Sequence, residues 1–376
     1  MKICVFPNDP LKTYYEKGEI KERYFNPKNI FDEVHIISLF DEEIEEEKVK
    51  MVAGKAIFKI HAVGKVTLIN KNQKKKEIIK LIKKINPNII RSFNPLLQGW
   101  IATKVKQELN IPLIISLHGD YDRDLRYQTK KNHNYKKYFK LQLTKIILEK
   151  YSLSNADEVI IIYNFIRNYA KKMGAKNINL IYNKVNLSQF SPNLKLDNKE
   201  SIPIIICVGR LIKEKNQECL INAIKDLDVK LLLIGNGTEY NYLKKLVKSL
   251  NIENKVQFET SIQHENIASY YNRSDIFALP IKYGGFAIPA LEAAASGIPV
   301  ILPKQKFDPN PDLIKDFALL IDNNPESFKK AIQKVLSEKS LRDNLINKGL
   351  NVTKEISSDV IEEKEKKLYL KLLDKI

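Results

Sequence analysis

The chain has 376 residues, 44% of them hydrophobic, and a formal net charge of +18. This length suits two domains of ordinary size, and the apolar fraction is that of a folded globular protein, which excludes a disordered or fibrous chain. No signal pattern and no apolar run of membrane-spanning length is visible in the sequence, so we expect a cytoplasmic protein, either free or peripheral on the inner face of the cytoplasmic membrane.

The first half of the chain alternates short apolar runs with segments of helical periodicity. Strands are predicted at 3–6, 34–39, 56–60, 89–92, 113–117, 158–163 and 178–182, and helices at 73–85, 98–109, 135–152 and 164–173. Several of the strands are apolar throughout, as expected for strands that are covered on both faces. The alternation predicts an α/β fold with a doubly wound parallel sheet.

A polar stretch at 186–201 is the best linker candidate, and the pattern starts again after it. Strands are predicted at 204–208, 230–234, 256–258, 276–279, 300–302 and 318–321, with helices between them. Two Rossmann-like domains are therefore expected, facing a central cleft at the carboxyl ends of their strands. We place the first domain at 1–190 and the second at 201–356, and we expect 357–376 to form a helix that packs back on the first domain.

The positive charge is concentrated in residues 51–150, which hold 22 basic and 6 acidic residues. Such an excess favours an anionic partner, namely a membrane face, a lipid phosphate or a nucleic acid, and a lysine-rich solvated surface is the alternative. Within this region, residues 130–146 interleave six lysines with Tyr135, Tyr138 and Phe139, which suits an anionic interface. A solvated helix whose aromatic residues pack inward would give the same pattern. We expect an anionic membrane surface and no nucleic acid.

The turn after the strand at 204–208 carries Arg210 and Lys215, two cations five residues apart. Cations on a strand-to-helix loop can straddle a diphosphate and neutralise its charge as it departs. Positive charge at a helix N-terminus opposes the helix dipole. That conflict favours a functional role over the alternative of two ordinary surface residues.

A Gly-rich turn at 283–287 opens a predicted helix that carries Glu292. Backbone amides at such a helix start can cradle a phosphate. A carboxylate on a largely apolar helix needs a partner, such as a ribose diol, unless it lies at a solvated edge. Gly235 follows the strand at 230–234 and is a weaker signal, because glycines after parallel strands are common turns.

Two residues of the first half also follow predicted strands. His118 lies at the end of the strand at 113–117, so it is a candidate for the predicted cleft, and a structural histidine is the alternative. Gly18 follows the first strand and would let the backbone approach a ligand closely, although an ordinary turn glycine explains it equally well.

Taken together, these segments resemble glycosyltransferase family 4, whose members are retaining, nucleotide-sugar-dependent enzymes of GT-B architecture. The resemblance is most specific at 208–216, 235–237, 274–280 and 286–300, and it extends to 116–120, 156–160 and 183–190. It implies a nucleotide-diphosphate sugar as donor and a glycan or lipid-linked acceptor in polysaccharide, lipopolysaccharide or glycolipid biosynthesis. It also implies that no metal and no other cofactor is required.

The resemblance assigns roles to single residues. Arg210 and Lys215 match the pair that binds the diphosphate and stabilises the departing nucleotide, and Glu292 matches the glutamate that holds the ribose hydroxyls. His118 matches a cleft histidine near the donor sugar. The remaining donor-binding positions are Gly18, the Gly235 turn, and the backbone around Gly284, Phe286, Ala287 and Ile288.

One departure from the family stands out. The first glutamate of its E-x7-E motif falls on Gly284 in an alignment without gaps. Its loss removes a charge-assisted hydrogen bond to the donor sugar, worth roughly 1.5–3 kcal/mol. A catalytically lapsed GT-B protein that acts as a binding or scaffold partner is therefore an alternative, and so is an inverting or epimerase-type GT-B enzyme.

Overall fold

The computed structural model describes residues 1–16, 20–192, 202–260, 262–263, 265–282, 288–304 and 317–374. The chain divides into two compact units, one made of residues 1–182 with 361–376 and the other of residues 183–360. These limits differ by a few residues from the predicted boundaries of 1–190, 201–356 and 357–376.

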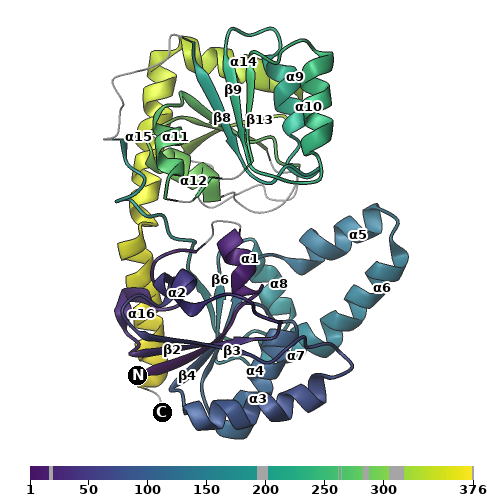
Figure 1. Ribbon diagram of the computed structural model, residues 1–376, viewed down its shortest axis with the longest axis vertical. Helices are drawn as coiled ribbons and strands as arrows, with labels where there is room; N and C mark the ends of the chain where they lie inside the picture. The colour runs from purple at the N-terminus through teal and green to yellow at the C-terminus, as the bar shows by residue number, and fades with distance from the viewer. Residues whose placement is uncertain are drawn as a thin grey trace. The chain divides into compact units, whose positions relative to one another are not determined.

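The first unit is built on a seven-stranded parallel sheet with the strand order β3-β2-β1-β4-β5-β6-β7 (Figure 1). The strands are β1 (Lys2–Phe6), β2 (Glu33–Ser38), β3 (Ile57–Ala62), β4 (Ile89–Ser92), β5 (Leu113–Leu117), β6 (Glu158–Ile161) and β7 (Ile178–Leu180). The β1, β4 and β5 strands are buried almost completely, which explains why most of their residues are apolar.

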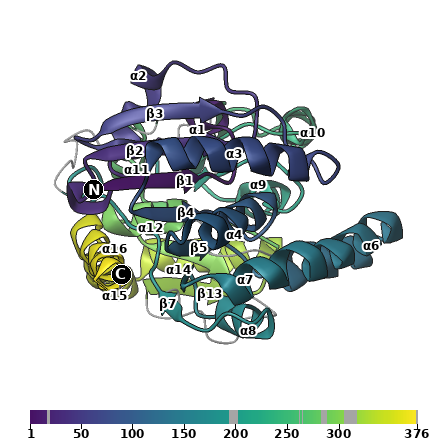
Figure 2. The ribbon, with the colours of Figure 1, turned by 90° about the horizontal axis from the view of Figure 1, so that it is seen from below.

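Helices connect these strands. They are α1 (Leu11–Glu16), α2 (Glu46–Val49), α3 (Lys71–Ile85), α4 (Leu97–Leu109), α5 (Gln128–Lys131), α6 (Tyr135–Thr144), α7 (Tyr151–Asn155) and α8 (Ile166–Lys172), with short helical turns η1 (Pro27–Asn29), η2 (Lys50–Ala53), η3 (Asp122–Tyr127) and η4 (Lys145–Lys150). Figure 2 shows α3 and α4 side by side, where they contact each other. The helix predicted at 135–152 is in fact α6, the π-helical turn η4 and then α7.

The last helix, α16 (Ser358–Leu373), joins the first unit through buried polar contacts. Arg91 on β4 donates to the Tyr369 hydroxyl and to the Glu365 carboxylate, each at 2.9 Å. Arg23 donates to Glu362 at 2.9 Å, and the Tyr369 ring meets Phe31 edge-on. Because Arg91 and Glu362 are almost inaccessible to solvent, these pairs fix where the helix lies on the unit.

The second unit is built on a six-stranded parallel sheet with the order β10-β9-β8-β11-β12-β13. Its strands are β8 (Ile204–Val208), β9 (Lys230–Ile234), β10 (Val256–Glu259), β11 (Ile276–Ala278), β12 (Val300–Pro303) and β13 (Ala318–Ile321). Its helices are α9 (Gln217–Ile224), α10 (Tyr240–Ser249), α11 (Ile267–Asn272), α12 (Ile288–Ala295), α14 (Pro325–Ser337) and α15 (Lys339–Glu355). Both sheets are parallel and doubly wound, which confirms the predicted fold class.

Candidate functional site

The strand order of the second unit reverses between β8 and β11. In open parallel sheets, ligands bind outside the carboxyl ends of the strands at such a reversal, because the loops there diverge and leave a crevice. The two loops at this point are 209–216 after β8 and 279–282 after β11. They are joined by a hydrogen bond of 2.8 Å from the Lys282 amide to the Glu214 carbonyl.

The loop after β8 is held by the loop after β9. The Gly209 amide donates to the Ile234 carbonyl and the Leu211 amide to the Asn236 carbonyl, both at 2.9 Å. Gly235 has φ of +140°, and a Cβ there would lie 2.2 Å from the Gly209 carbonyl oxygen. Gly235 therefore permits the two backbones to meet, whereas its contact with a ligand stays a prediction.

The helix that follows this loop, α10, begins only at Tyr240. Gly237 has φ of +159°, and a Cβ there would lie 2.3 Å from the Leu211 carbonyl oxygen. The Glu239 amide also donates to that carbonyl at 2.9 Å. These residues serve the packing of the two loops before the helix starts.

Arg210 and Lys215 lie on this braced loop. The Arg210 side chain is exposed and Lys215 is half-buried, and neither forms an ion pair with any residue that the structure describes. Burial lowers the pKa of Lys215, and the nearby Arg210 charge lowers it further. Two cations held together in this way gain stability from an anion, as a diphosphate site requires.

An asparagine that the sequence analysis missed ties the loops together. The Asn323 side chain, just after β13, donates to the Pro280 and Ile281 carbonyls at 3.1 and 3.0 Å. It also accepts from the Asn216 side chain at 3.3 Å. Asn323 thus links the β8, β11 and β13 loops at one edge of the sheet, and its place directly after a predicted strand was the signal that could have found it.

Glu292 lies about one turn into α12, which begins at Ile288. Its side chain is buried, and the Tyr271 hydroxyl of α11 donates to its carboxylate at 3.2 Å. Burial and the Glu292 charge together raise the pKa of Tyr271 well above its usual value, so the phenol remains a donor. Sequence reasoning missed Tyr271, since nothing in its spacing points to α12.

Four predicted site residues, Gly18, Gly284, Phe286 and Ala287, lie outside the described residues. Ile288 is the first residue of α12. The expected phosphate contacts of this turn therefore stay predictions.

His118 lies in the first unit, directly after β5. Its ring stacks on Phe93 with the centroids 5.7 Å apart, and the Arg91 guanidinium lies 4.5 Å from the centre of the Phe93 ring. Although solvent reaches the side chain, the surrounding protein and the Arg91 charge lower the pKa of His118 to about 4. The imidazole is therefore neutral at pH 7, so it can exchange hydrogen bonds with a hydroxyl group but is not the charged imidazolium that a general acid requires.

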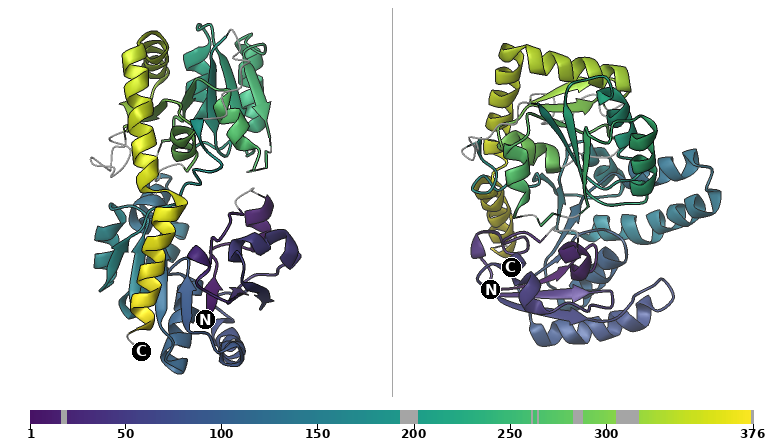
Figure 3. Two further views of the ribbon diagram at one scale, coloured as in Figure 1. Left: turned by 90° about the vertical axis from the view of Figure 1, so that its left-hand side faces the viewer. Right: turned by 45° about the horizontal axis from the view of Figure 1, so that its top comes forward.

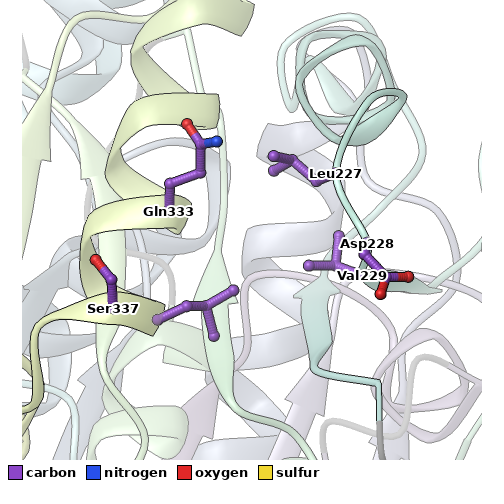
Figure 4. Close-up of a pocket in the computed structure, with 6 residues that line it drawn as sticks. Leu227, Asp228, Val229, Gln333 and Ser337 are labelled. Atoms are coloured by element: carbon purple, nitrogen blue, oxygen red, sulfur yellow. The ribbon is translucent and has the colours of Figure 1, made fainter.

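A pocket of about 450 Å³ lies elsewhere in the second unit (Figure 4). It is lined by Leu227, Asp228, Val229, Gln333, Leu336 and Ser337. These residues precede β9 or belong to α14, so the pocket is at the amino ends of the strands, opposite the Arg210 loop. Its charged group is a carboxylate, which does not suit a diphosphate.

Among the residues that the structure describes, no three His, Cys, Asp or Glu side chains gather as metal ligands would. The absence of a metal requirement stays a prediction, since the turn at 283–287 lies outside the described residues. No described helix combines the length and the apolar character needed to traverse a bilayer.

Comparison with known proteins agrees with this arrangement. The family model for glycosyl transferases group 1 matches residues 193–352, and the model for glycosyltransferase family 4 matches residues 32–189. An uncharacterized glycosyltransferase of Methanocaldococcus jannaschii is 25% identical over 76% of this chain and 76% of its own length.

Two more relatives extend the comparison. The Campylobacter jejuni N-acetylgalactosamine-N,N'-diacetylbacillosaminyl-diphospho-undecaprenol 4-alpha-N-acetylgalactosaminyltransferase is 28% identical over 50% of this chain and 51% of its own length. The crystal structure of Anabaena HepE in complex with UDP has a TM-score of 0.75 and 13% identity, covering 99% of this chain and 100% of that one, which shows a shared GT-B fold. The two family matches, over two parallel-sheet units of GT-B type, show that this chain belongs to the group 1 glycosyltransferases of glycosyltransferase family 4.

Proposed function

We propose that this glycosyltransferase uses a nucleotide-diphosphate sugar and transfers the sugar, with retention of configuration, to a glycan or lipid-linked acceptor. The product would belong to a polysaccharide, a lipopolysaccharide or a glycolipid. The observation that carries the donor proposal is the pair Arg210 and Lys215, held after β8 at the strand-order reversal without an ion-pair partner among the described residues. The known UDP complex of a protein with this fold supports the same class of donor.

The chemistry follows from where charge develops. As the bond between the sugar and the diphosphate breaks, negative charge grows on the phosphate oxygen, and fixed cations stabilise that charge more than they stabilise the ground state. Arg210 would bind two oxygens with its planar fork, and Lys215 would act as a point charge. A phosphate next to Lys215 would also oppose the lowering of the pKa of that lysine and keep it protonated.

In this proposal Glu292 binds the nucleoside end of the donor. A carboxylate that accepts hydrogen bonds from the two ribose hydroxyls fits a buried glutamate already supported by a tyrosine donor. The neutral His118 would hydrogen-bond the donor sugar rather than protonate it. No nucleophile and no metal are part of the proposed step, and the departing phosphate would accept the proton of the acceptor hydroxyl.

The acceptor proposal has two supports. One relative acts, by its name, on a diphospho-undecaprenol-linked sugar. Residues 51–150 of this chain also carry a large basic excess, which favours residence at an anionic membrane surface. We therefore propose a lipid-linked acceptor, presented at the cytoplasmic face of a membrane.

A donor panel tests the proposal. Purified protein is incubated with UDP-, GDP- and other nucleotide-linked sugars, and nucleotide binding and release are measured. Arg210→Ala and Lys215→Ala should each lower turnover by about 10- to 100-fold, the value of one charge-assisted contact. Lys213→Ala is the matched control, because Lys213 is an exposed lysine of the same loop.

The outcomes separate the alternatives. Binding of a nucleotide with no turnover of any donor would favour the lapsed scaffold protein. A product with inverted anomeric configuration, read by NMR, would favour an inverting enzyme. If no donor bound and Lys213→Ala behaved like Arg210→Ala, the assignment of the site to a nucleotide sugar would fail.

A further inference from the structure

A helical arm extends from the first unit between β5 and β6. We use this name for residues 121–150, which comprise η3, α5, the turn at 132–134, α6 and η4. Figure 1 and the right-hand view of Figure 3 show α5 and α6 as a hairpin directed away from the sheet. No residue of α6 is buried. The arm is therefore an addition to the unit rather than a part of its core.

The base of the arm is fixed by buried charges. Arg126 of η3 forms an ion pair with Glu149 of η4 and donates to the Leu141 carbonyl at 2.8 Å. The Tyr169 hydroxyl donates to the same Glu149 carboxylate, and Lys145 pairs with Asp122 at 2.6 Å. Arg126 and Glu149 are almost inaccessible to solvent. These contacts hold the two halves of the hairpin together and give the arm a defined direction.

One face of the returning half is apolar and exposed. Its members are Tyr135, Phe139, Leu143, Ile146 and Ile147, spaced by three or four residues, so they form a single stripe along α6 and η4. Phe139 and Ile146 are each 69% exposed and Leu143 is 53% exposed. A row of large apolar side chains in water marks a surface that is covered in use.

The positive charge around this stripe indicates what kind of partner covers it. Residues 125–148 contain seven basic residues and no acidic one. Lys130, Lys131, Lys136, Lys137 and Lys140 are exposed, and they form no ion pair with the described residues. A second copy of the arm would bring like charges together. A single-stranded nucleic acid would stack on aromatic rings, whereas Leu143, Ile146 and Ile147 offer none. Apolar residues flanked by lysines fit the boundary between acyl chains and anionic head groups.

We propose that the helical arm is a membrane-docking element whose apolar stripe enters the interface of an anionic bilayer while its lysines contact lipid phosphates. The inference rests on the proposed membrane location of the enzyme and assigns that location to one element. Within the basic region 51–150, only the helical arm is assigned to the membrane, because it combines positive charge with exposed apolar side chains. The lysines of α3 have the charge but not the stripe, since the apolar residues of that helix are turned inward.

Vesicle binding by the full chain tests the proposal. Co-sedimentation is measured with phosphatidylcholine vesicles, with and without about one third phosphatidylglycerol, and binding is expected only with the anionic lipid. Phe139→Ser combined with Ile146→Ser should lower partitioning by at least about tenfold. Lys136→Glu combined with Lys140→Glu should lower it by more than about fivefold per lysine, because each change reverses a charge.

Matched controls come from the same basic region. Ile69→Ser removes a side chain that is 96% exposed outside the arm, and Lys76→Glu with Lys80→Glu reverses two exposed charges on α3. These variants should keep most of the binding. Equal losses in the controls and the arm variants would overturn the proposal in favour of general electrostatic attraction, and an absence of binding by the unaltered chain would overturn it outright.

Two further readouts keep the causes apart. Light scattering gives the oligomeric state, and a dimer that Phe139→Ser with Ile146→Ser converts to a monomer would identify a second copy as the occupant and overturn the proposal. In the absence of vesicles, the arm variants should release nucleotide from the donor identified in the panel at the same rate as the unaltered chain. Vesicle binding without turnover of any donor would refute the proposed enzyme function alone, whereas turnover without vesicle binding would refute the docking element alone.

Discussion

Gly235 and Gly209 meet backbone to backbone, so closely that a Cβ on Gly235 would lie 2.2 Å from the Gly209 carbonyl oxygen. The contact joins the loop after β9 to the loop that carries Arg210 and Lys215. The position of the two cations therefore depends on Gly235, which lies outside the 209–216 loop that carries them.

Gly235→Ala should displace the β8 loop. The alanine would combine a clash with backbone and a φ of +140° that side chains rarely adopt, a strain of about 1–3 kcal/mol. We expect a lower melting temperature together with weaker nucleotide binding, measured by thermal shift with and without UDP. Asn236→Ala is the control, because the carbonyl that accepts from Leu211 remains. Unchanged nucleotide affinity in Gly235→Ala would contradict the link between the two loops.

Tyr271→Phe should weaken the nucleoside end of the site. The change removes the hydroxyl that donates to the buried Glu292 carboxylate, and a buried charge that loses a donor costs about 1–3 kcal/mol. We expect a fall in the free energy of unfolding of that order and a loss of affinity for the nucleotide. Tyr270→Phe changes the neighbouring tyrosine of the same helix and keeps the Tyr271 bond to Glu292, so it should leave both quantities near their original values.

Calorimetry with ribose and deoxyribose nucleotides tests whether Glu292 binds the nucleotide or only stabilises the fold. If Glu292 holds the ribose hydroxyls, the unaltered protein should prefer the ribose form, and Glu292→Gln should reduce that preference. Equal discrimination before and after the glutamine substitution would show that the carboxylate serves the fold and not the ligand.

His118 should remain neutral throughout the range in which the enzyme is assayed. With its pKa lowered to about 4, the folded protein binds fewer protons than the unfolded chain between pH 4 and the ordinary histidine value of about 6.5. The sign follows from linkage: stability falls as the pH drops through this window, and His118→Gln should remove that part of the fall. Urea unfolding at pH 7 and pH 5 measures it.

The same histidine gives an activity test. A neutral hydrogen-bonding residue predicts no inflection from His118 in kcat/KM between pH 6 and pH 8, and a milder loss in His118→Gln than in His118→Ala. An inflection that disappears in both variants would show that the imidazole works in its charged form.

The sequence was sufficient for the sheets but not for the contacts at their edges. The β8 strand (Ile204–Val208) is continuously apolar because helices cover both faces, so local composition alone predicted it. Asn323 and Tyr271 could not be predicted in the same way. Each reaches its partner through folding of residues far apart in the chain, Asn323 to Ile281 and Tyr271 to Glu292.

The helix type within the predicted helix 135–152 could not be predicted from the periodicity. The segment 135–152 has one unbroken helical pattern, yet residues 145–150 adopt a π-helical turn in which Glu149 reaches Arg126. Periodicity reports which side of a helix is apolar, and it reports neither a buried ion pair nor a local change from α-helical to π-helical hydrogen bonding.

Gly284→Glu tests the departure from the family pattern. The resemblance gives this position a carboxylate that contacts donor-sugar hydroxyls, while the cations on the β8 loop and the buried Glu292 are kept. A chain that retains the diphosphate and nucleoside contacts is expected to be active, so the missing carboxylate points to a donor sugar that does not need it. Gly284→Glu should therefore lower transfer from the true donor and raise transfer from common hexose donors, by about 10-fold for one charge-assisted hydrogen bond.

The comparison of donors decides the meaning of position 284. Rates are measured for the unaltered chain and Gly284→Glu with each nucleotide sugar of the panel, and nucleotide affinity is measured alongside, because the substitution should leave the diphosphate contacts of Arg210 and Lys215 intact. A rise in transfer from every donor would instead mean that the glycine eroded an ordinary hexose site. Identical rates throughout would mean that residue 284 does not contact the sugar, since a new carboxylate in contact with sugar hydroxyls must change the free energy of the transition state for at least one donor.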